Sequence, residues 1–421
     1  MEYKRIEIGD GIGFSTVIDE KFKTSALTVR LITELSGETA SEDSLAMSVL
    51  TDTNSKYTTI AAMSEALTEL YGSGISSFVS KRGDLMISGI SASWLASRYA
   101  IYGEDIQGSM LEIFSDCLFR PNVVNGEFES EAFAIAKQEL LDRIDAELNS
   151  KRDYALAKAI ETAFKGEPAA NRCYGTRRTA EAVTSKGAYE AYKRILSTAR
   201  VEITFVSAED DPSVEAMMRK GFAEIDRHPA DISYMSLSPL KSEPASVSKE
   251  FDVNQCKMVM VFKTDCTDVF ALRMFSTILG ETPVSKLFRN VREKLSLCYY
   301  CGCRKLITKG AIIIDSGVER ENIEKARTEI LAQIADMQKG DFTDEDMENA
   351  CLAVENSLDQ VGDTTASYSS WYFERLCEGK IVTPEEMAAD FRSVTKERII
   401  EAAKSLKLDT EYLMLDREVK E

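Results

Sequence analysis

The sequence predicts an α+β protein of two similar domains, each a mostly antiparallel sheet with helices packed on one face. Three observations support this. The chain has 421 residues, of which 44% are hydrophobic, a length that suits two domains of about 200 residues better than one core. Segments typical of strands and helices alternate in both halves of the chain. A segment rich in proline and serine, without apolar periodicity, separates the halves.

The first half predicts strands separated by helices. Alternating or β-branched residues predict the strands, and capping side chains such as Ser41 before Leu45 predict helix starts. In the stretch 128–165, Phe133, Leu140 and Leu148 have the spacing of one buried helix face, together with Leu141 and Ile144. The elements expected here are strands at 4–9, 24–33, 75–81, 84–92 and 201–206, and helices after Ser41 and at 58–71, 95–117, 128–165 and 178–196.

The order of elements restarts after a linker. Three of the eight prolines lie between Pro229 and Glu250, which predicts a first domain over 1–232, a linker over 233–250 and a second domain over 251–421. The second domain is expected to hold strands at 256–263, 298–306 and 311–317 and helices at 267–280 and 284–294. The turn Thr308-Lys-Gly310 matches Lys81-Arg-Gly83 at a constant offset, which favours a structural repeat.

Composition excludes several classes of function. The net charge is −19, both halves are acidic, and no basic stripe is present, so we expect no nucleic-acid partner. Nine cysteines at irregular spacing favour free thiols in a reducing compartment. No stretch approaches the roughly 20 apolar residues of a membrane span, and no signal peptide is recognisable. We therefore expect a soluble cytoplasmic protein without a membrane partner.

One segment of the second half carries a recognisable signature. Residues Leu279 to Tyr300 read LGETPVSKLFRNVREKLSLCYY. This segment resembles the second-domain signature of the insulinase/pitrilysin zinc peptidases, the family that includes mitochondrial processing peptidase. Tyr174-Gly-Thr, the stretch from Tyr189 to Val206, and Val394-Thr-Lys-Glu-Arg398 resemble other parts of that family. The chain is most similar to its zinc-less Firmicutes members associated with aminopentanol modification of elongation factor P.

The zinc site of that family does not match this chain. The family's HxxEH helix supplies two histidine ligands and a glutamate base, and a later glutamate completes the site. By position these should fall at Leu45, Ser48 and Val49 and near Arg143. None of these residues suits the role, and the whole chain has one histidine, His228. We expect no metal, no cofactor and no catalytic residue on this chain alone.

The resemblance also implies a substrate-binding pair. Family members hold a substrate backbone carbonyl with an arginine and a tyrosine seven residues apart, and Arg292 and Tyr299 stand at those positions. A guanidinium and a phenol can together polarise a carbonyl. Tyr300 is the alternative if the register is shifted by one. The signature departs from the family at Glu281 and Ser296, where glycines are usual, and at Lys286, where arginine is usual.

Other clusters favour structural roles. Period-2 alternation puts Cys301 and Cys303 on one strand face and Cys298 on the other, and buried free thiols are favoured over a metal site. A cysteine protease that uses His228 lacks a recognisable nucleophile motif. Solvated helix faces are favoured over an acid/base site for a set of carboxylates, and packing against the sheet is favoured for an aromatic run. These two sets are Glu127, Glu129, Glu131 and Glu139, and Trp371-Tyr-Phe373.

The leading hypothesis is a non-catalytic subunit of a two-chain zinc peptidase. Arg292 and Tyr299 would hold the peptide substrate in trans, and an HxxEH-bearing paralogue would supply zinc and general base as the partner in a heterodimer. The alternative is a scaffold or peptide-binding protein, as a homodimer or a subunit of another assembly, with no role in hydrolysis.

Overall fold

The computed structural model describes residues 1–417 and divides the chain into two compact units. Unit 1 comprises Met1–Asp145, Asn171–Ser233 and Val361–Lys380. Unit 2 comprises Ala146–Ala170, Tyr234–Gln360 and Ile381–Glu421. The units therefore differ from the predicted continuous domains in two segments: 146–170 belongs to unit 2, and 361–380 belongs to unit 1.

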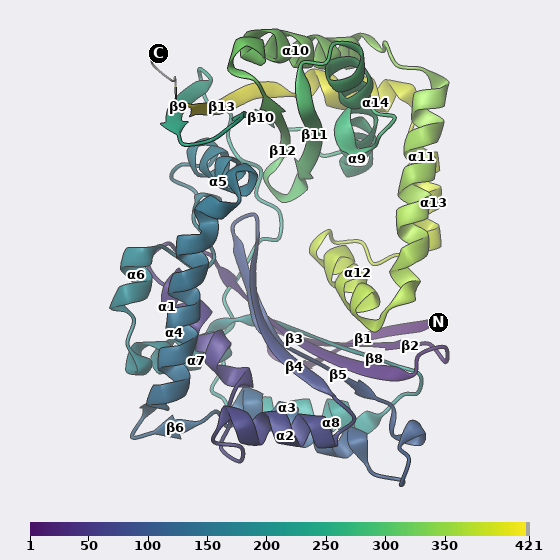
Figure 1. Cartoon of the computed structure of the whole chain (residues 1–421). Coiled ribbons are helices and arrows are strands. Elements are labelled where there is room, and N and C mark those ends of the chain that lie inside the picture. The colour runs from purple at the N-terminus through teal and green to yellow at the C-terminus, as the bar shows by residue number, and fades with distance from the viewer. Residues whose placement is uncertain (418–421) are drawn as a thin grey trace. The chain divides into compact units, whose positions relative to one another are not determined.

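Unit 1 is built on a six-stranded sheet with the order β1-β2-β8-β3-β5-β4 (Figure 1). Only β2 and β8 pair in parallel. Its strands are β1 (Glu2–Gly9), β2 (Ile12–Ile18), β3 (Thr24–Glu34), β4 (Gly74–Arg82), β5 (Leu85–Leu95) and β8 (Arg200–Ser207), with a small ribbon of β6 (Val123–Val124) and β7 (Glu127–Phe128). Its helices are α1 (Ala40–Ser48), α2 (Ile60–Glu69), α3 (Ile106–Phe119), α4 (Ser130–Asp145), α6 (Arg177–Ala182), α7 (Ser185–Thr198), α8 (Pro212–Ala223) and α12 (Thr365–Cys377).

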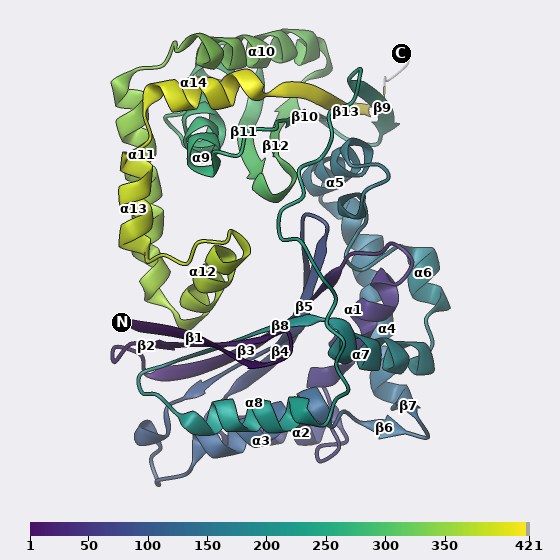
Figure 2. The same ribbon diagram turned by 180° about the vertical axis from the view of Figure 1, so that it is seen from behind.

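The two faces of this sheet have different chemistry. On β3, Leu27, Val29 and Leu31 are fully buried in the core with residues of α1, α3, α7 and α8; of these helices, α3 and α8 are seen below the sheet in Figures 1 and 2. The alternate residues Thr28 and Arg30 face the other way, as strand geometry requires. Helix α12 lies on that second face and contacts β3 and β8.

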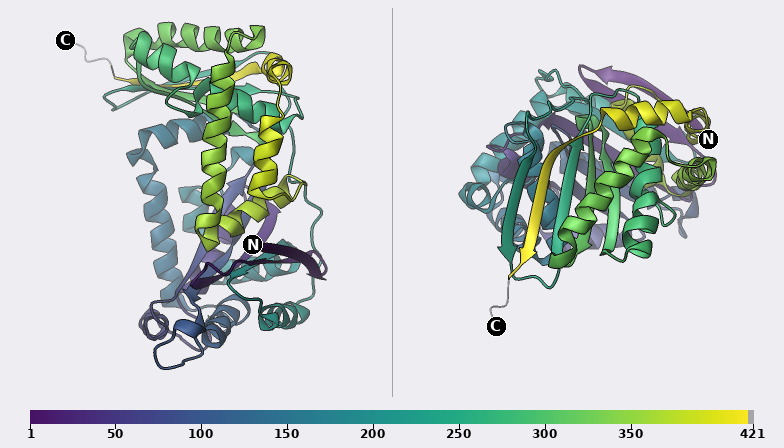
Figure 3. Two further views of the ribbon diagram at one scale, coloured as in Figure 1. Left: turned by 90° about the vertical axis from the view of Figure 1, so that its right-hand side faces the viewer. Right: turned by 90° about the horizontal axis from the view of Figure 1, so that it is seen from above.

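Unit 2 is built on a five-stranded sheet with the order β11-β12-β10-β13-β9. In the right panel of Figure 3 the yellow β13 lies between two teal strands, β9 and β10. The strands are β9 (Ala245–Phe251), β10 (Cys256–Lys263), β11 (Cys298–Leu306), β12 (Ala311–Val318) and β13 (Lys407–Asp416). The helices are α5 (Lys151–Ala163), α9 (Val269–Ser276), α10 (Ile323–Lys339), α11 (Asp344–Asp359), α13 (Pro384–Arg392) and α14 (Lys396–Ser405), with π-helical turns η5 (Thr277–Glu281) and η6 (Phe288–Lys294).

The helix expected at 128–165 is two helices that belong to different units. A 3-10 turn at Ala146–Asn149 ends α4, and the Ser150 side chain accepts a hydrogen bond from the Asp153 amide to start α5. Phe133 and Leu140 are buried in unit 1 as expected, but Leu148 is exposed in the turn. The small residues Ala155 and Ala159 of α5 pack on Val259 and Val261 of β10.

The predicted fold class is confirmed. Both units contain mostly antiparallel sheets with a layer of helices, and each sheet carries one further helix, α12 or α5, on its other face. Gly83 and Gly310, which end the two matching turns, both adopt left-handed backbone with φ of 59° and 60°. The predicted linker 233–250 includes most of β9, which pairs in parallel with β13. Within residues 1–417, no helix has the length and apolarity needed to cross a membrane.

Candidate functional site

The signature segment forms one edge of unit 2. It runs through η5 and η6 into β11, which is the edge strand of the sheet. Both π-helical turns pack against β11. This segment therefore places η6, which carries Arg292, next to the first residues of the edge strand β11, which include Tyr299.

Arg292 is an exposed cation held by an aromatic ring. It lies in the last turn of η6, and its guanidinium carbon is 4.5 Å from the centre of the Phe288 ring. Such stacking fixes the plane of the guanidinium and leaves its edge donors free. Among residues 1–417, no carboxylate forms an ion pair with Arg292. The arginine is therefore available to an external acceptor.

A β-bulge exposes Tyr299. The register between β11 and β12 pairs Cys298 with Val318 and Tyr300 with Gly317, so Tyr299 is the extra residue. A bulge re-aims the side chain that it carries, and Tyr299 is 67% exposed. Its neighbour Tyr300 instead lies against two cations, with Arg152 4.3 Å and Lys257 5.6 Å from the ring centre. Burial raises the pKa of Tyr300, so Tyr299 is the accessible phenol.

The three departures from the family signature have structural consequences. Ser296 adopts left-handed backbone with a φ of 51°, a conformation that costs little only for glycine. The Glu281 carboxylate accepts hydrogen bonds from Lys305 at 2.6 and 2.7 Å. Lys286 donates to the backbone oxygen of Asp341 at 2.7 Å. Polar contacts and a strained serine thus replace the usual glycines and arginine.

The positions expected for zinc ligands contain no metal site. Leu45 and Val49 are buried in the unit 1 core, and the Ser48 hydroxyl donates to the Ser44 carbonyl oxygen on the same helix. The Arg143 guanidinium stacks 4.7 Å from the centre of the Tyr174 ring. Over the described residues 1–417, no group of three His, Cys, Asp or Glu side chains could hold a metal. These residues do not fit zinc.

The acidic cluster near α4 has a structural role. The Glu129 carboxylate accepts hydrogen bonds from the Glu131 and Ala132 amides at the helix start, and those bonds lower the pKa of Glu129. Glu127 accepts a hydrogen bond from the Ser185 hydroxyl at 2.6 Å. His228 is exposed beside Asp226, 3.3 Å away. None of these groups converges with a nucleophile.

The cysteine cluster differs from the predicted alternation. Cys301 and Cys303 are buried free thiols as expected. The bulge changes the phase of the strand, so that Cys298 lies beside Cys301 and not on the opposite face. A hydrogen bond from the Cys301 thiol lowers the pKa of Cys298, and the nearby Arg292 charge acts in the same direction. Cys298 is therefore the most easily ionised thiol of the three.

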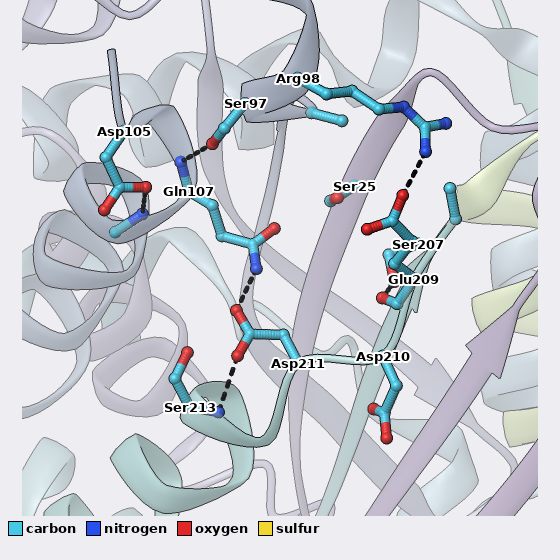
Figure 4. A pocket seen from close by; sticks show the side chains of 13 residues that line it. Ser25, Ser97, Arg98, Asp105, Gln107, Ser207, Glu209, Asp210, Asp211 and Ser213 are labelled. Atoms are coloured by element: carbon cyan, nitrogen blue, oxygen red, sulfur yellow. Dashed lines mark hydrogen bonds and ion pairs between the residues drawn. The ribbon is translucent and has the colours of Figure 1, made fainter. Parts of the chain in front are cut away.

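A polar hollow of about 330 Å³ in unit 1 serves helix capping (Figure 4). Asp105 accepts a hydrogen bond from the Gly108 amide and Asp211 from the Ser213 amide, at the starts of α3 and α8. Gln107 donates to Asp211, and Arg98 pairs with Glu209 at 2.5 Å. These side chains are engaged with helix-start amides or with one another, and Asp210 is a further carboxylate in the lining.

Comparison with known proteins points to a peptidase family. Residues 182–354 match the family described as "Peptidase M16 inactive domain". The chain is 28% identical over 408 residues, 96% of each chain, to the "Probable inactive metalloprotease YmfF" of Bacillus subtilis (strain 168). It is 20% identical over 288 residues to an "Uncharacterized zinc protease" of Rickettsia bellii (strain RML369-C), covering 67% of this chain and 69% of that protein.

Solved structures share the fold. A conserved protein from Enterococcus faecalis V583 matches with a TM-score of 0.91 at 23% identity over 100% of both chains. A peptidase M16 inactive domain from Pseudomonas fluorescens matches with a TM-score of 0.80 at 16% identity, over 99% of this chain and 98% of that one. A protease from Helicobacter pylori matches with a TM-score of 0.79 at 12% identity, over 98% and 99%.

Proposed function

We propose that this chain, which is similar to inactive members of the peptidase M16 family, is the non-catalytic subunit of a two-chain zinc peptidase. A paralogue that bears HxxEH would supply the zinc and the general base. This chain would supply Arg292 and Tyr299 to hold the peptide substrate. The observation that carries the proposal is the loss of every zinc-site residue together with an exposed, unpaired Arg292 next to the bulge that exposes Tyr299.

The chemistry of the pair suits a backbone carbonyl. The Arg292 guanidinium stacks on Phe288, so less rotamer freedom is lost when it donates to a substrate oxygen. The Tyr299 hydroxyl is a second donor, and two donors on one oxygen stabilise the charge that develops during attack on the carbonyl. A peptide extended beside the edge strand β11 would offer such carbonyls at regular intervals.

The first experiment is a native pull-down of the chain from its own cells, with mass spectrometry of proteins recovered in about equal amount. Recovery of an HxxEH-bearing partner supports the two-chain peptidase. Recovery of the chain alone, or of a partner unrelated to peptidases, supports the alternative of a scaffold or peptide-binding protein with no role in hydrolysis.

The second experiment measures kcat/KM of the reconstituted complex. Arg292→Ala should lower kcat/KM about 10²–10³-fold, as loss of an oxyanion-type donor does. Lys294→Ala removes an exposed charge from the same turn, and Tyr300→Phe removes the neighbouring phenol, so both serve as matched controls that should retain activity. An Arg292→Ala complex within about twofold of wild type would contradict the proposal.

A further inference from the structure

A hollow of about 420 Å³ in unit 1 lies between the second face of the sheet and α12. Neighbouring strands supply its floor: Thr28 and Arg30 from β3, and Ser91 from β5. The helix supplies Ser369 and Phe373. We call this space, lined by these five residues and by Phe78, Ser80 and Arg82 of β4, the Arg30 hollow.

A glycine keeps the floor open. Gly89 pairs with Arg30 on one side and with Phe78 on the other. A Cβ at Gly89 would lie 1.9 Å from the Val29 carbonyl oxygen, and the φ of 151° also disfavours a side chain. No side chain therefore separates the Arg30 guanidinium from the Phe78 ring in this row.

Arg30 is a buried cation with only neutral partners. It is 7% exposed. Its Nη1 donates to the Thr204 hydroxyl at 3.4 Å and its Nη2 to the Ser369 hydroxyl at 3.0 Å. Within the described part of the chain it forms no ion pair, and burial lowers its pKa to about 10. Desolvation outweighs the attraction of the nearby Glu202 and Glu374 carboxylates, which act in the opposite direction on this pKa. A buried guanidinium without an ion pair is costly, so an anion in the hollow would stabilise it.

Three hydroxyl groups of the hollow leave two hydrogens available as hydrogen-bond donors. Ser369 is 2% exposed and accepts from Arg30, so its own hydrogen points elsewhere. Thr28 and Ser91 share one hydrogen bond at 2.9 Å, which uses one of their two hydroxyl hydrogens. Among residues 1–417, the two remaining hydroxyl hydrogens form no further hydrogen bond. Donors that converge without acceptors favour an oxyanion as ligand.

The other charged groups around the hollow are engaged elsewhere. The Lys81 ammonium donates to the Asn171 carbonyl oxygen. Arg82 pairs with Glu378 at 3.5 Å. Glu374, the carboxylate on the α12 side, is exposed and lies 3.5 Å from Arg375. None of these side chains forms an ion pair with Arg30, and Glu202, its cross-strand neighbour, pairs with Arg5 at 2.8 Å.

We propose that the Arg30 hollow binds an oxyanion, the carboxylate or phosphate group of a small ligand. The Arg30 fork donates to two of its oxygens, and Ser369 with the Thr28–Ser91 pair donates to the others. The Phe78 and Phe373 rings flank the ligand; the Phe373 ring centre lies 4.7 Å from the guanidinium carbon. This binding site is independent of the pair in unit 2, because all of its residues belong to unit 1.

The test is isothermal titration calorimetry of the purified chain with inorganic phosphate and, separately, with succinate, at constant ionic strength. We expect saturable binding of at least one probe, weakened at least tenfold in Arg30→Met. Arg219→Met is the matched control, because it removes the same charge from a residue paired with Glu215 in the same unit, and it should bind as wild type does.

A second variant, Ser369→Ala, keeps the proposal testable if Arg30→Met does not fold. Ser369→Ala retains the charge and removes one donor, and it should weaken binding several-fold while circular dichroism stays unchanged. Binding of phosphate alone identifies a phosphate site, and binding of succinate alone identifies a carboxylate site. Absence of binding by both probes, or equal binding by wild type and both hollow variants, overturns the proposal. Peptidase assays take no part in this test, so its failure leaves the proposed function untouched.

Discussion

Gly280 and Cys303 approach each other more closely than any other residue type at position 280 allows. A Cβ on Gly280 would lie 2.7 Å from the Cβ of Cys303 and 2.9 Å from its backbone nitrogen. Both residues are buried. The contact seats the π-helical turn η5 on β11, and η5 opens the segment that positions Arg292.

Replacing this glycine should therefore destabilise unit 2. Gly280→Ala places a methyl group where backbone and a neighbouring Cβ stand, and overpacking of this kind costs about 1–3 kcal/mol. Chemical unfolding monitored by circular dichroism measures the loss. Gly74→Ala is the control, because a Cβ at Gly74 meets nothing within 4 Å. Equal stability of the two variants would contradict the packing argument.

Ser296→Gly should stabilise the protein, in contrast to Gly280→Ala. The φ of 51° at Ser296 is a left-handed conformation that costs a residue with a side chain roughly 1 kcal/mol relative to glycine. The variant should raise the free energy of unfolding by about that amount. Ser296→Ala, which removes the hydroxyl and keeps the strain, should not. A gain shared by both variants would assign the effect to the hydroxyl and refute the strain.

The buried carboxylate of Asp409 should give unit 2 a dependence on pH. It is fully buried and lies 2.5 Å from the Lys241 ammonium and 3.3 Å from that of Lys263. Burial alone would raise the pKa of Asp409, but hydrogen bonds from Lys241 and Thr410 hold it below the usual value. A depressed pKa contributes stability above the unfolded value of about 3.9, and this stability is lost as pH falls through the folded pKa.

Asp409→Asn should thus lower the free energy of unfolding by about 3 kcal/mol at pH 7, because it leaves the buried Lys263 ammonium with only the more distant Glu167 carboxylate, 3.9 Å away. The difference in the free energy of unfolding between wild type and variant should become smaller as the pH falls below about 4. Urea unfolding of both proteins across that range measures it. A gap that stays constant with pH would show that charge pairing at Asp409 is not its cause.

Cys298 should be the first thiol of its cluster to react. The hydrogen bond from Cys301 and the Arg292 charge lower its pKa, whereas burial raises the pKa of Cys303 to about 12. The thiolate is the reactive form, so iodoacetamide near pH 7 should label Cys298 before Cys301 and Cys303. Peptide mapping by mass spectrometry follows the order. Arg292→Ala should slow the labelling of Cys298, and preferential labelling of Cys301 would refute the assignment.

The sequence alone determined the features that depend on local pattern or on composition. The apolar and β-branched runs of the second half located β10 and β11 to the residue. The signature from Leu279 to Tyr300 indicated the family. A histidine count of one excluded a two-histidine zinc site without any alignment or structure.

Only the tertiary structure decided which residues share a site. The stretch 128–165 reads as one helix because its propensity is continuous, yet it is cut into α4 and α5 so that each can bury its apolar face on a different sheet. The bulge that exposes Tyr299 and leaves Tyr300 half-buried depends on pairing with β12. Arg30 reads as a polar residue in an alternating strand, and only α12, more than 300 residues away in the chain, covers it. Burial and the satisfaction of charge depend on long-range packing, which no local pattern contains.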